Sequence, residues 1–343
     1  MVTYNTTMWK IIGHRQLLAF FEHVRSSGHL GHAYLFTGPA QIGKRTLALA
    51  FAQTILCTGQ HANPVGSPCG SCHACLKVQS TTHPDLSIIR SSESKKALSI
   101  DTIREVLRAS TLQPQEGRYS IFLLPNAESL SLEAANALLK TLEEPAPQTI
   151  LLLTTTNEQL LPGTIVSRCQ VLPMMLVNTG EIRDALVRQW NLDQDYAQTI
   201  SNLSAGRPGW AIAASQNPEL QEQRGAWLQI MKTLCESGPT QRIKIAAKLA
   251  HDTEPLEELL TVWLIWWREM LLASEGYTSP GNPDAIRIHR YSSQIQPAVA
   301  RQVVEQIQEA LRQLEQNANP RLVIEALLLE LPQFKQGTEM RSR

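Results

Sequence analysis

The sequence has neither a net charge nor a long apolar run. Its 31 Lys and Arg residues balance 31 Asp and Glu residues over 343 positions, so the chain lacks the long-range positive field with which non-specific DNA-binding proteins capture DNA. Apolar runs such as residues 150–153 are far too short to span a bilayer, and the N-terminus shows no basic-then-apolar signal pattern. We therefore expect a cytoplasmic protein with no membrane partner, and any DNA contact is expected to be local or shared with partners.

Cysteine is scarce outside residues 57–75, which hold four of the six cysteines. Because the cytoplasm keeps thiols reduced, a disulfide framework is not expected. The four clustered residues are Cys57, Cys69, Cys72 and Cys75. Two-residue gaps allow neighbouring thiolates to point at one ion, and four thiolates complete a tetrahedral Zn²⁺ site with no position open for water. The spacing therefore predicts a structural zinc module.

Other ligand sets stay open for this cluster. Cysteines separated by two residues also match part of an iron–sulfur pattern, and His61 or His73 is an alternative to one cysteine ligand. Four unrelated reduced thiols are the remaining alternative. Cys169 and Cys235 stand alone in the sequence, so we interpret them as ordinary buried thiols.

The first half of the chain alternates short apolar runs with helical patterns. The runs suit parallel strands buried on both faces and cover residues 34–37, 86–89, 120–124 and 149–153. Helical spacing lies between them at residues 46–57, 100–112 and 129–144. This alternation predicts an α/β domain with right-handed crossovers.

The second half of the chain is predicted to be helical, because strand patterns nearly vanish after residue 179. Its strongest helical patterns cover residues 255–273, 296–317 and 320–331. The sequence GRPG at 206–209 interrupts a small helical unit, and QNP at 216–218 marks a hinge. We predict an α/β domain at 1–173 that contains the cysteine module at 57–75, a helical lid at 174–216, a helical bundle at 217–336 and a frayed tail at 337–343.

Three tryptophans lie on one predicted helix of the bundle. Trp263, Trp266 and Trp267 share this helix with Leu260 and Leu264. Burial in the core is the first interpretation of such an apolar face. A contribution to subunit assembly is the alternative, since aromatic residues are enriched at the cores of interfaces.

A glycine-rich loop follows the first predicted strand and precedes a helix. Its sequence is GPAQIGK at residues 38–44. Gly38 and Gly43 let backbone N–H groups turn inward, and Lys44 is placed to reach the terminal phosphates of a nucleotide. The motif predicts a phosphate-binding loop with ATP or ADP as its ligand, and a glycine turn with a surface lysine is the alternative.

The groups that ATP hydrolysis requires are missing. Arg45 stands where hydrolytic loops carry Ser or Thr for Mg²⁺, and Thr46 comes one position late, rotated by about 100° around the helix. Pro125 and Asn126 replace the acidic pair after the third strand, and neither is a carboxylate base. Glu128 follows in the next segment and is a weak substitute. We therefore predict a chain that keeps a phosphate loop but has no ATPase activity of its own.

Four motifs carry a resemblance to a known family. They are HAYLF at residues 32–36, AANALLKTLEEP at 134–145, LPGTIVSRC at 161–169 and NANPRLVIEAL at 317–327. Together with cysteines inserted after the helix of the phosphate loop, they resemble the AAA+ clamp-loader subunits of bacterial DNA polymerase III over nearly the whole chain. The resemblance implies a P-loop NTPase-like AAA+ domain with a five-stranded parallel sheet, a small helical lid and an all-α collar that joins a hetero-oligomer.

The resemblance also implies a role. Motor subunits of this family need the magnesium hydroxyl and the acidic pair, and this sequence lacks both. The resemblance therefore implies a stator subunit that supports ATP-driven loading of the sliding clamp onto primed DNA in replication. Its implied partners are the gamma/tau motor subunits, the delta subunit, the sliding clamp and primed DNA. DNA polymerase activity then belongs to the whole assembly.

Functional residues are carried over from the family motifs. The SRC sequence at 167–169 matches the family's arginine-finger motif, so Arg168 is expected to stabilise charge on the γ-phosphate of ATP in a neighbouring motor subunit. A surface arginine is the alternative. Arg207 lies where relatives sense nucleotide from the lid, and an arginine at a helix break with no ligand is the alternative. Residues 155–157 lie in the family's sensor region, and residues that simply cap the strand are the alternative.

Two rival functions stay open. One is an ATP-hydrolysing motor subunit of the same loader, or another AAA+ ATPase that acts on DNA. The other is a zinc-containing protein-interaction scaffold. The substitutions at Arg45, Pro125 and Asn126 argue against the first rival.

Overall fold

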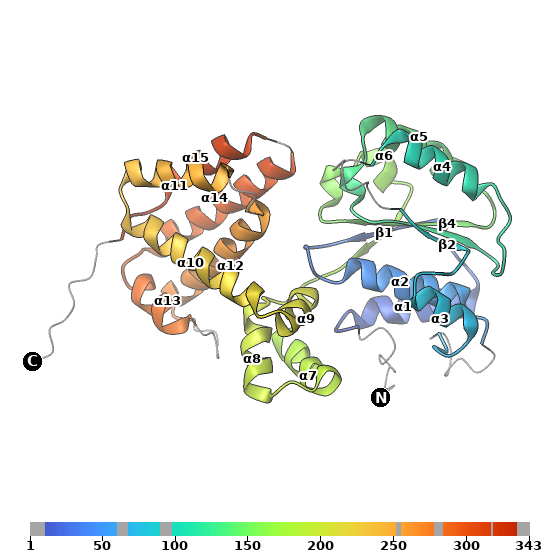
Figure 1. Cartoon of the computed structure of the whole chain (residues 1–343), viewed down its shortest axis with the longest axis horizontal. Coiled ribbons are helices and arrows are strands. Elements are labelled where there is room, and N and C mark those ends of the chain that lie inside the picture. Colours follow the sequence, from blue (N-terminus) through green and yellow to red (C-terminus); the bar gives the residue numbers. More distant parts are fainter. Residues whose placement is uncertain are drawn as a thin grey trace, which may run out of the picture. The chain divides into compact units, whose positions relative to one another are not determined.

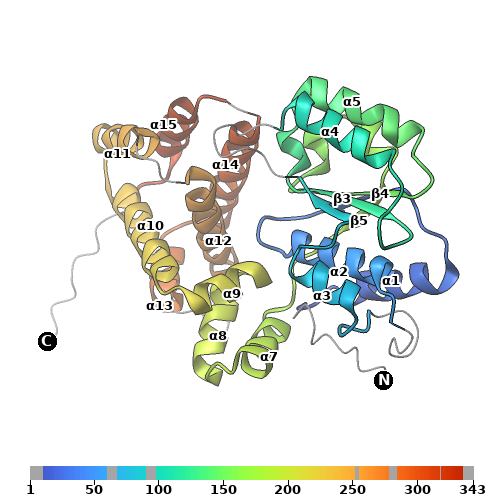
Figure 2. The same ribbon diagram turned by 45° about the vertical axis from the view of Figure 1, so that its right-hand side comes forward.

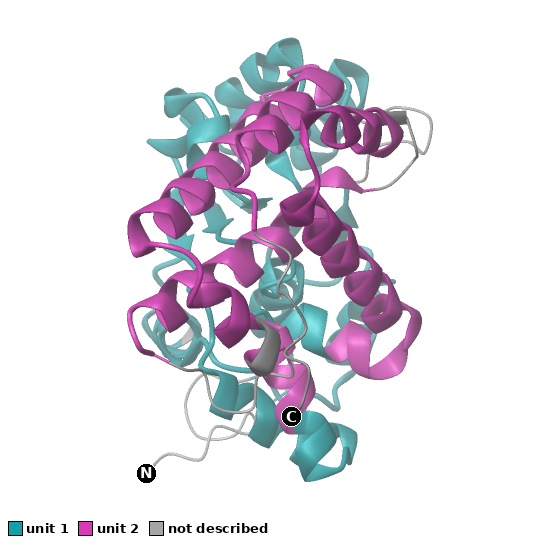
Figure 3. Ribbon diagram, turned by 90° about the vertical axis from the view of Figure 1, so that its left-hand side faces the viewer, with its two compact units in different colours: residues 1–197, 206–211 teal, residues 198–205, 212–343 magenta. Residues whose placement is uncertain are grey.

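The computed structural model of the chain describes residues 11–59, 68–89, 98–251, 255–277, 284–316 and 318–334. The chain divides into two compact units, which Figure 3 distinguishes by colour. Unit 1 comprises residues 1–197 and 206–211, and unit 2 comprises residues 198–205 and 212–343. The finer division into α/β domain, lid and collar stays a prediction, and the predicted tail at 337–343 lies outside the described residues.

Unit 1 is built on a parallel sheet. Within the described residues its five strands are β1 (Ala33–Thr37), β2 (Leu86–Ile88), β3 (Ser120–Leu124), β4 (Thr149–Thr155) and β5 (Gln170–Pro173). Their order is β2-β3-β4-β1-β5, and every pairing is parallel. The strands β1, β3 and β4 are buried along their whole length, which explains their unbroken apolar sequences. The predicted five-stranded parallel sheet is confirmed.

Helices cover both faces of this sheet, as Figures 1 and 2 show. One face carries α1 (Arg15–Ser27), α2 (Lys44–Leu56) and α3 (His73–Gln79), and the other carries α4 (Ile100–Ser110), α5 (Leu132–Glu143) and α6 (Gly163–Val166). The first core is aromatic, with the rings of Phe21 and Phe51 stacked 4.3 Å apart. The second is aliphatic and takes in the buried stripe Ala134, Leu138 and Leu142 of α5. This apolar stripe of α5 therefore packs into the core.

Serine caps determine where α4 and α5 begin. Ser99 Oγ accepts a hydrogen bond from the Thr102 N–H (3.3 Å), and Ser131 Oγ accepts one from the Ala134 N–H (3.2 Å). Each bond satisfies a backbone donor that the first helical turn leaves unpaired. The predicted start of α5 at residue 129 was three residues early, because a short 3-10 helix, Ala127–Ser129, precedes the Ser131 cap.

In its described part, the chain after β5 forms helices joined by loops and contains no strand. The helices are α7 (Thr179–Trp190), α8 (Gln194–Leu203), α9 (Pro208–Gln216), α10 (Glu219–Glu236), α11 (Pro239–His251), α12 (Leu256–Ser274), α13 (Ala285–Ser292), α14 (Pro297–Glu315) and α15 (Pro320–Glu330). The all-helical prediction for this half is confirmed. In the described residues, no helix combines the length and the apolar character that a membrane crossing requires.

The core of unit 2 forms around α12. Trp263 and Trp267 are completely buried, and Trp266 is nearly so. The indole N–H of Trp263 donates to the Trp227 carbonyl oxygen at 2.9 Å, so the polar atom of this large side chain is satisfied inside the core. The tryptophan face therefore packs within unit 2, as the first interpretation of the sequence predicted.

Arg242 on α11 joins the ends of two other helices. Its buried guanidinium donates hydrogen bonds to the carbonyl oxygens of Leu234, Leu328, Leu331 and Pro332. These carbonyls lie at the C-terminal ends of α10 and α15, where the helix itself leaves acceptors unpaired. One arginine thus supplies donors to four carbonyl oxygens at the ends of these two helices.

Asp85, just before β2, fixes the loop that leads into β3. Its carboxylate accepts three backbone N–H groups, from Gln115 at 2.6 Å, Glu116 at 2.9 Å and Gly117 at 2.7 Å. Burial acts to raise the pKa of Asp85, but the three donors together outweigh it, so the pKa lies below its usual value. A charged carboxylate is therefore part of the folded structure.

We expect Asp85→Asn to lower the free energy of unfolding by about 1–3 kcal/mol at pH 7, because an amide accepts fewer hydrogen bonds and carries no charge. The folded-state pKa is depressed, so the stabilisation is complete above the unfolded pKa of about 4 and is lost as the pH falls through the folded value. Urea unfolding at pH 7 and at pH 3 measures both effects. Asp101→Asn, at an exposed ion pair, is the matched control, and equal losses in the two variants would contradict the prediction.

Candidate functional site

The predicted phosphate loop connects β1 to α2. Gly38 and Gly43 have φ angles of 148° and 101°, in the region that favours glycine. A Cβ atom on Gly38 would lie 2.5 Å from the carbonyl oxygen of Met174, so no larger residue fits there. The first turn of α2 begins at Lys44 with N–H groups directed toward the loop. The local geometry is that of a loop able to surround an anion.

Lys44 points back into this loop. Its Nζ atom donates to the carbonyl oxygens of Gly38 (2.6 Å) and Pro39 (2.9 Å), and the side chain is buried. Burial lowers the pKa of Lys44 to about 8, while the negative charge of Glu128 opposes the shift. The lysine therefore holds the loop in shape and keeps its ammonium group inside it.

The segment that carries Arg207 lies against the phosphate loop. The Gly209 N–H donates to the Gln41 carbonyl oxygen at 2.9 Å, and a Cβ on Gly209 would come within 2.6 Å of the same oxygen. Arg207 itself is buried. The structure thus brings the predicted lid arginine into the same region as the loop, while its contact with a nucleotide stays a prediction.

The residues at the positions that bind Mg²⁺ and activate water in hydrolytic relatives do not form a hydrolytic site here. Arg45 and Thr46 are both exposed on α2. Asn126, just after β3, adopts a left-handed conformation, and its N–H donates to Thr154 Oγ1 at 3.1 Å. Neither Pro125 nor Asn126 supplies a carboxylate at this edge of the sheet.

Glu128, the expected weak substitute for the acidic pair, accepts hydrogen bonds in the structure. Its Oε1 atom accepts the backbone N–H and the hydroxyl of Thr156 at 3.1 and 3.0 Å, and its buried Oε2 has no hydrogen-bond partner in the described structure. Its charge also acts on Lys44. Spacing along the strand could not reveal this position, because the 3-10 turn after β3 redirects the chain.

Arg168 lies at the surface between α6 and β5. Its Nη2 atom is 2.7 Å from Oε1 of Glu143, the last residue of α5, and its Nη1 atom donates to the Thr164 carbonyl oxygen at 3.0 Å. The adjacent Cys169 is half-buried, and burial raises the pKa of its thiol to about 12. Burial likewise raises the pKa of Cys235 to about 12, so burial disfavours the thiolate form of both isolated cysteines.

The four clustered cysteines come together in space. Their ligand atoms all lie within 4.8 Å of one another, and Sγ of Cys69 is 3.9 Å from Sγ of Cys75. Four thiolates at the usual zinc–sulfur bond length of about 2.3 Å form a tetrahedron with sulfurs about 3.8 Å apart. The observed group fits such an ion after small adjustments. His73 is not one of the grouped ligands among the described residues, and His61 lies outside them.

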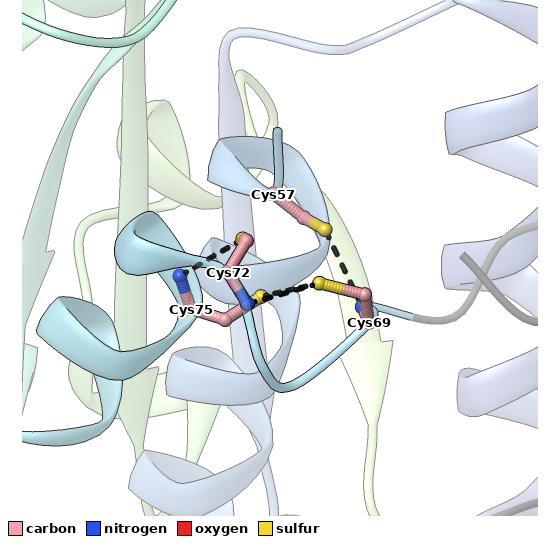
Figure 4. A group of neighbouring side chains, drawn as sticks. All are labelled: Cys57, Cys69, Cys72 and Cys75. Atoms are coloured by element: carbon pink, nitrogen blue, oxygen red, sulfur yellow. Dashed lines mark hydrogen bonds between the residues drawn. The ribbon is translucent and has the colours of Figure 1, made fainter. Parts of the chain in front are cut away.

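Local backbone geometry turns the sulfurs inward. Cys57 follows α2 directly, and Cys72 is the N-cap of α3. Backbone N–H groups donate to three sulfurs: Cys69 N–H to Cys57 Sγ at 3.3 Å, Cys72 N–H to Cys69 Sγ at 3.3 Å, and Cys75 N–H to Cys72 Sγ at 3.4 Å (Figure 4). A hydrogen bond between Cys57 and Cys75 lowers the pKa of Cys57 and raises that of Cys75. The three backbone N–H donors stabilise the thiolate form of these cysteines, which is the form that binds a metal.

The sheet order and the loop together define a class of protein. A parallel sheet in the order β2-β3-β4-β1-β5, with a glycine loop between β1 and α2, is a P-loop NTPase-like domain of the AAA+ type. At the end of β3, Pro125 and Asn126 stand in place of the acidic pair that hydrolysis requires. The class is therefore an AAA+ protein with a modified phosphate loop.

Comparison with known proteins gives the family. The family described as "DNA polymerase III, delta subunit" matches residues 13–177. DNA polymerase III subunit delta' of Pseudomonas aeruginosa is 33% identical over 253 residues, 73% of this chain and 74% of the relative. Subunit delta' of Bacillus subtilis is 29% identical over 88% of this chain and 91% of the relative. Subunit tau of B. subtilis is 25% identical over 94% of this chain and 61% of the relative. The chain belongs to the family of DNA polymerase III delta' subunits.

We expect Lys44 to titrate with a midpoint of about 8, well below the value of about 10.4 for an exposed lysine. The Cε signal of Lys44 in protein labelled with ¹³C-lysine measures this midpoint, and Lys44→Arg assigns the signal. Glu128→Gln removes a negative charge and should lower the midpoint further, whereas Glu133→Gln, on the exposed start of α5, should leave it unchanged. A midpoint near 10.4 would contradict the burial of this amine.

Proposed function

We propose that the chain is the stator subunit of a bacterial clamp loader and supports the ATP-driven loading of the sliding clamp onto primed DNA. The observation that carries the proposal is the combination of a phosphate loop without hydrolytic groups and a surface arginine in the family's finger motif. Membership in the delta' family supports it. In this role the chain hydrolyses no ATP itself, and the polymerase activity belongs to the assembly.

Arg168 acts on a neighbour in this proposal. The γ-phosphate of ATP gains negative charge on its oxygens during transfer, and an arginine from an adjacent subunit stabilises that charge. Arg168 is partly exposed at the end of α6, so a second chain has access to its guanidinium. The motor subunits of the gamma/tau type would hold the ATP, and the delta subunit, the clamp and primed DNA complete the assembly.

The phosphate loop keeps the means to bind a nucleotide. Backbone N–H groups between Gly38 and Gly43, the Lys44 ammonium and the first turn of α2 with Arg45 and Thr46 would hold the phosphates of ATP or ADP, with Arg207 reaching them from the segment packed on the loop. A bound nucleotide would supply anionic oxygens to these donors. The Lys44 ammonium would have to leave the Gly38 and Pro39 carbonyl oxygens to meet them.

The cysteine group is proposed to hold a structural zinc ion. Four sulfurs in a closed set leave no coordination position for water, which separates this site from a catalytic one. When bound, the ion supplies a cross-link between the end of α2 and the start of α3. The module, the lid at 174–216 and the collar at 217–336 are then structural and assembly parts of a cytoplasmic protein.

An ATP-hydrolysing motor is the second candidate. The likeness to B. subtilis subunit tau favours it, as does the Glu128 carboxylate close enough to act on Lys44. The exposed Arg45 at the position of the magnesium hydroxyl opposes it. A test of hydrolysis by the chain alone separates the two candidates.

Metal analysis tests the zinc proposal. We expect about one zinc per chain by elemental analysis, and Cys75→Ser should lose the ion and lower the thermal midpoint by several degrees, because the metal stabilises only the folded chain. Cys235→Ser, an isolated buried thiol, is the control and should keep its zinc. Iron in the purified protein, or full zinc in the Cys75 variant, would contradict the assignment.

Reconstitution tests the stator role. The purified chain should show no Mg²⁺-dependent ATPase, and turnover should appear when motor subunits are added. Arg168→Ala should leave assembly intact by gel filtration and slow hydrolysis at the adjacent motor site by about 10³-fold or more. Arg104→Ala, another exposed arginine of unit 1, is the control. ATPase activity of the chain alone would favour the motor candidate, and unchanged turnover in the Arg168 variant would reject the finger.

A further inference from the structure

The ion pair between Arg168 and Glu143 joins two segments of unit 1 that are distant in sequence. Nη2 of Arg168 lies 2.7 Å from Oε1 of Glu143 at the end of α5, and Nη1 donates to the Thr164 carbonyl oxygen in α6 at 3.0 Å. Nη1 also has a longer contact of 3.5 Å with Ser167 Oγ. Contacts on both terminal nitrogen atoms fix the position and the plane of the guanidinium. A single contact would leave the plane free to rotate.

The ion pair between Arg168 and Glu143 contributes little to the stability of the fold. The side chains of Arg168 and Glu143 are 34% and 51% exposed, and exposed pairs of this kind contribute at most about 1 kcal/mol because water competes for both charges. Ordering a long arginine side chain costs a comparable amount of conformational entropy. The main physical effect of the pair is therefore on the direction in which the guanidinium points.

The arrangement leaves donors for a second anion. A guanidinium has five N–H groups in a planar fork, and the Nε–H of Arg168 makes no hydrogen bond to any residue that the structure describes. Phosphate oxygens of a neighbouring subunit can therefore bind the remaining N–H groups while Glu143 and Thr164 keep theirs. No bond of the resting arrangement has to break first.

We propose that Glu143 is a positioning residue for the Arg168 finger. This inference rests on the proposed function, because it gives Glu143 a role only through Arg168. An arginine already oriented toward the reacting phosphate stabilises the transition state without paying again for the loss of side-chain freedom. Glu143 touches no nucleotide and acts only by holding the guanidinium in place.

The chain offers a matched control at the next position. Glu144 is the C-cap of α5, carries the same charge and is also exposed. In the described residues it forms no ion pair with Arg168. A general effect of negative charge at this surface would appear in both glutamate variants, whereas a positioning effect would appear only in Glu143.

The test uses the reconstituted complex with excess DNA and clamp. We expect Glu143→Ala to lower kcat for ATP by about three- to tenfold with KM unchanged, since the finger acts in the transition state. Glu143→Asp should restore part of the rate, and Glu144→Ala should match the unaltered complex. A double variant with Arg168→Ala should be no slower than Arg168→Ala alone, because Glu143 has no other route to the chemistry.

The outcomes distinguish the positioning role of Glu143 from the finger role of Arg168. If Arg168→Ala slows turnover but Glu143→Ala leaves it unchanged or raises it, the positioning role is wrong and the finger stands. Additive losses in the double variant, or an equal loss in Glu144→Ala, also overturn the positioning role. If Arg168→Ala has no effect, both proposals fall. Gel filtration and circular dichroism of each variant ensure that assembly and folding are unchanged.

Discussion

Parallel pairing of β1 between β4 and β5 is the constraint on which the rest of unit 1 depends. Because parallel strands have their carboxyl ends at one edge, β1 presents the phosphate loop beside the residues that follow β3 and β4. The Gly38 N–H donates to the Thr155 carbonyl oxygen at 3.3 Å and extends this pairing into the loop. A shift of register by one residue would turn the buried side chains of β1 to the opposite face and disrupt both cores.

Much of this arrangement could be predicted from the sequence, for a physical reason. Strands buried on both faces have continuous apolar sequences, and the runs at 120–124 and 149–153 fall within observed strands. The spacing of the cysteines also predicted their grouping, because two-residue gaps constrain the backbone strongly. The start of α5 was misplaced because a helix N-terminus depends on which of two nearby serines, Ser129 or Ser131, caps it, and here Ser131 does so.

Contacts between distant segments were beyond sequence reasoning. The ion pair of Arg168 with Glu143 and the hydrogen bonds of Thr156 to Glu128 depend on the packing of side chains after the chain has folded. Periodicity and spacing describe local geometry only. The modified loop keeps its shape because Lys44 and Gly209 hold its carbonyl oxygens, and neither contact requires the groups that hydrolysis uses.

The place of Arg242 has a consequence for synthesis of the protein on the ribosome. Its partners at Leu328, Leu331 and Pro332 belong to the end of α15, so they emerge long after Arg242 itself. Until then a cation destined for burial stays in water, because burying it without acceptors is costly. Unit 2 therefore completes its packing only after α15 has been synthesised, whereas the strands of unit 1, which end at Pro173, are synthesised earlier. The position of this one side chain therefore affects the order in which the two units complete their packing.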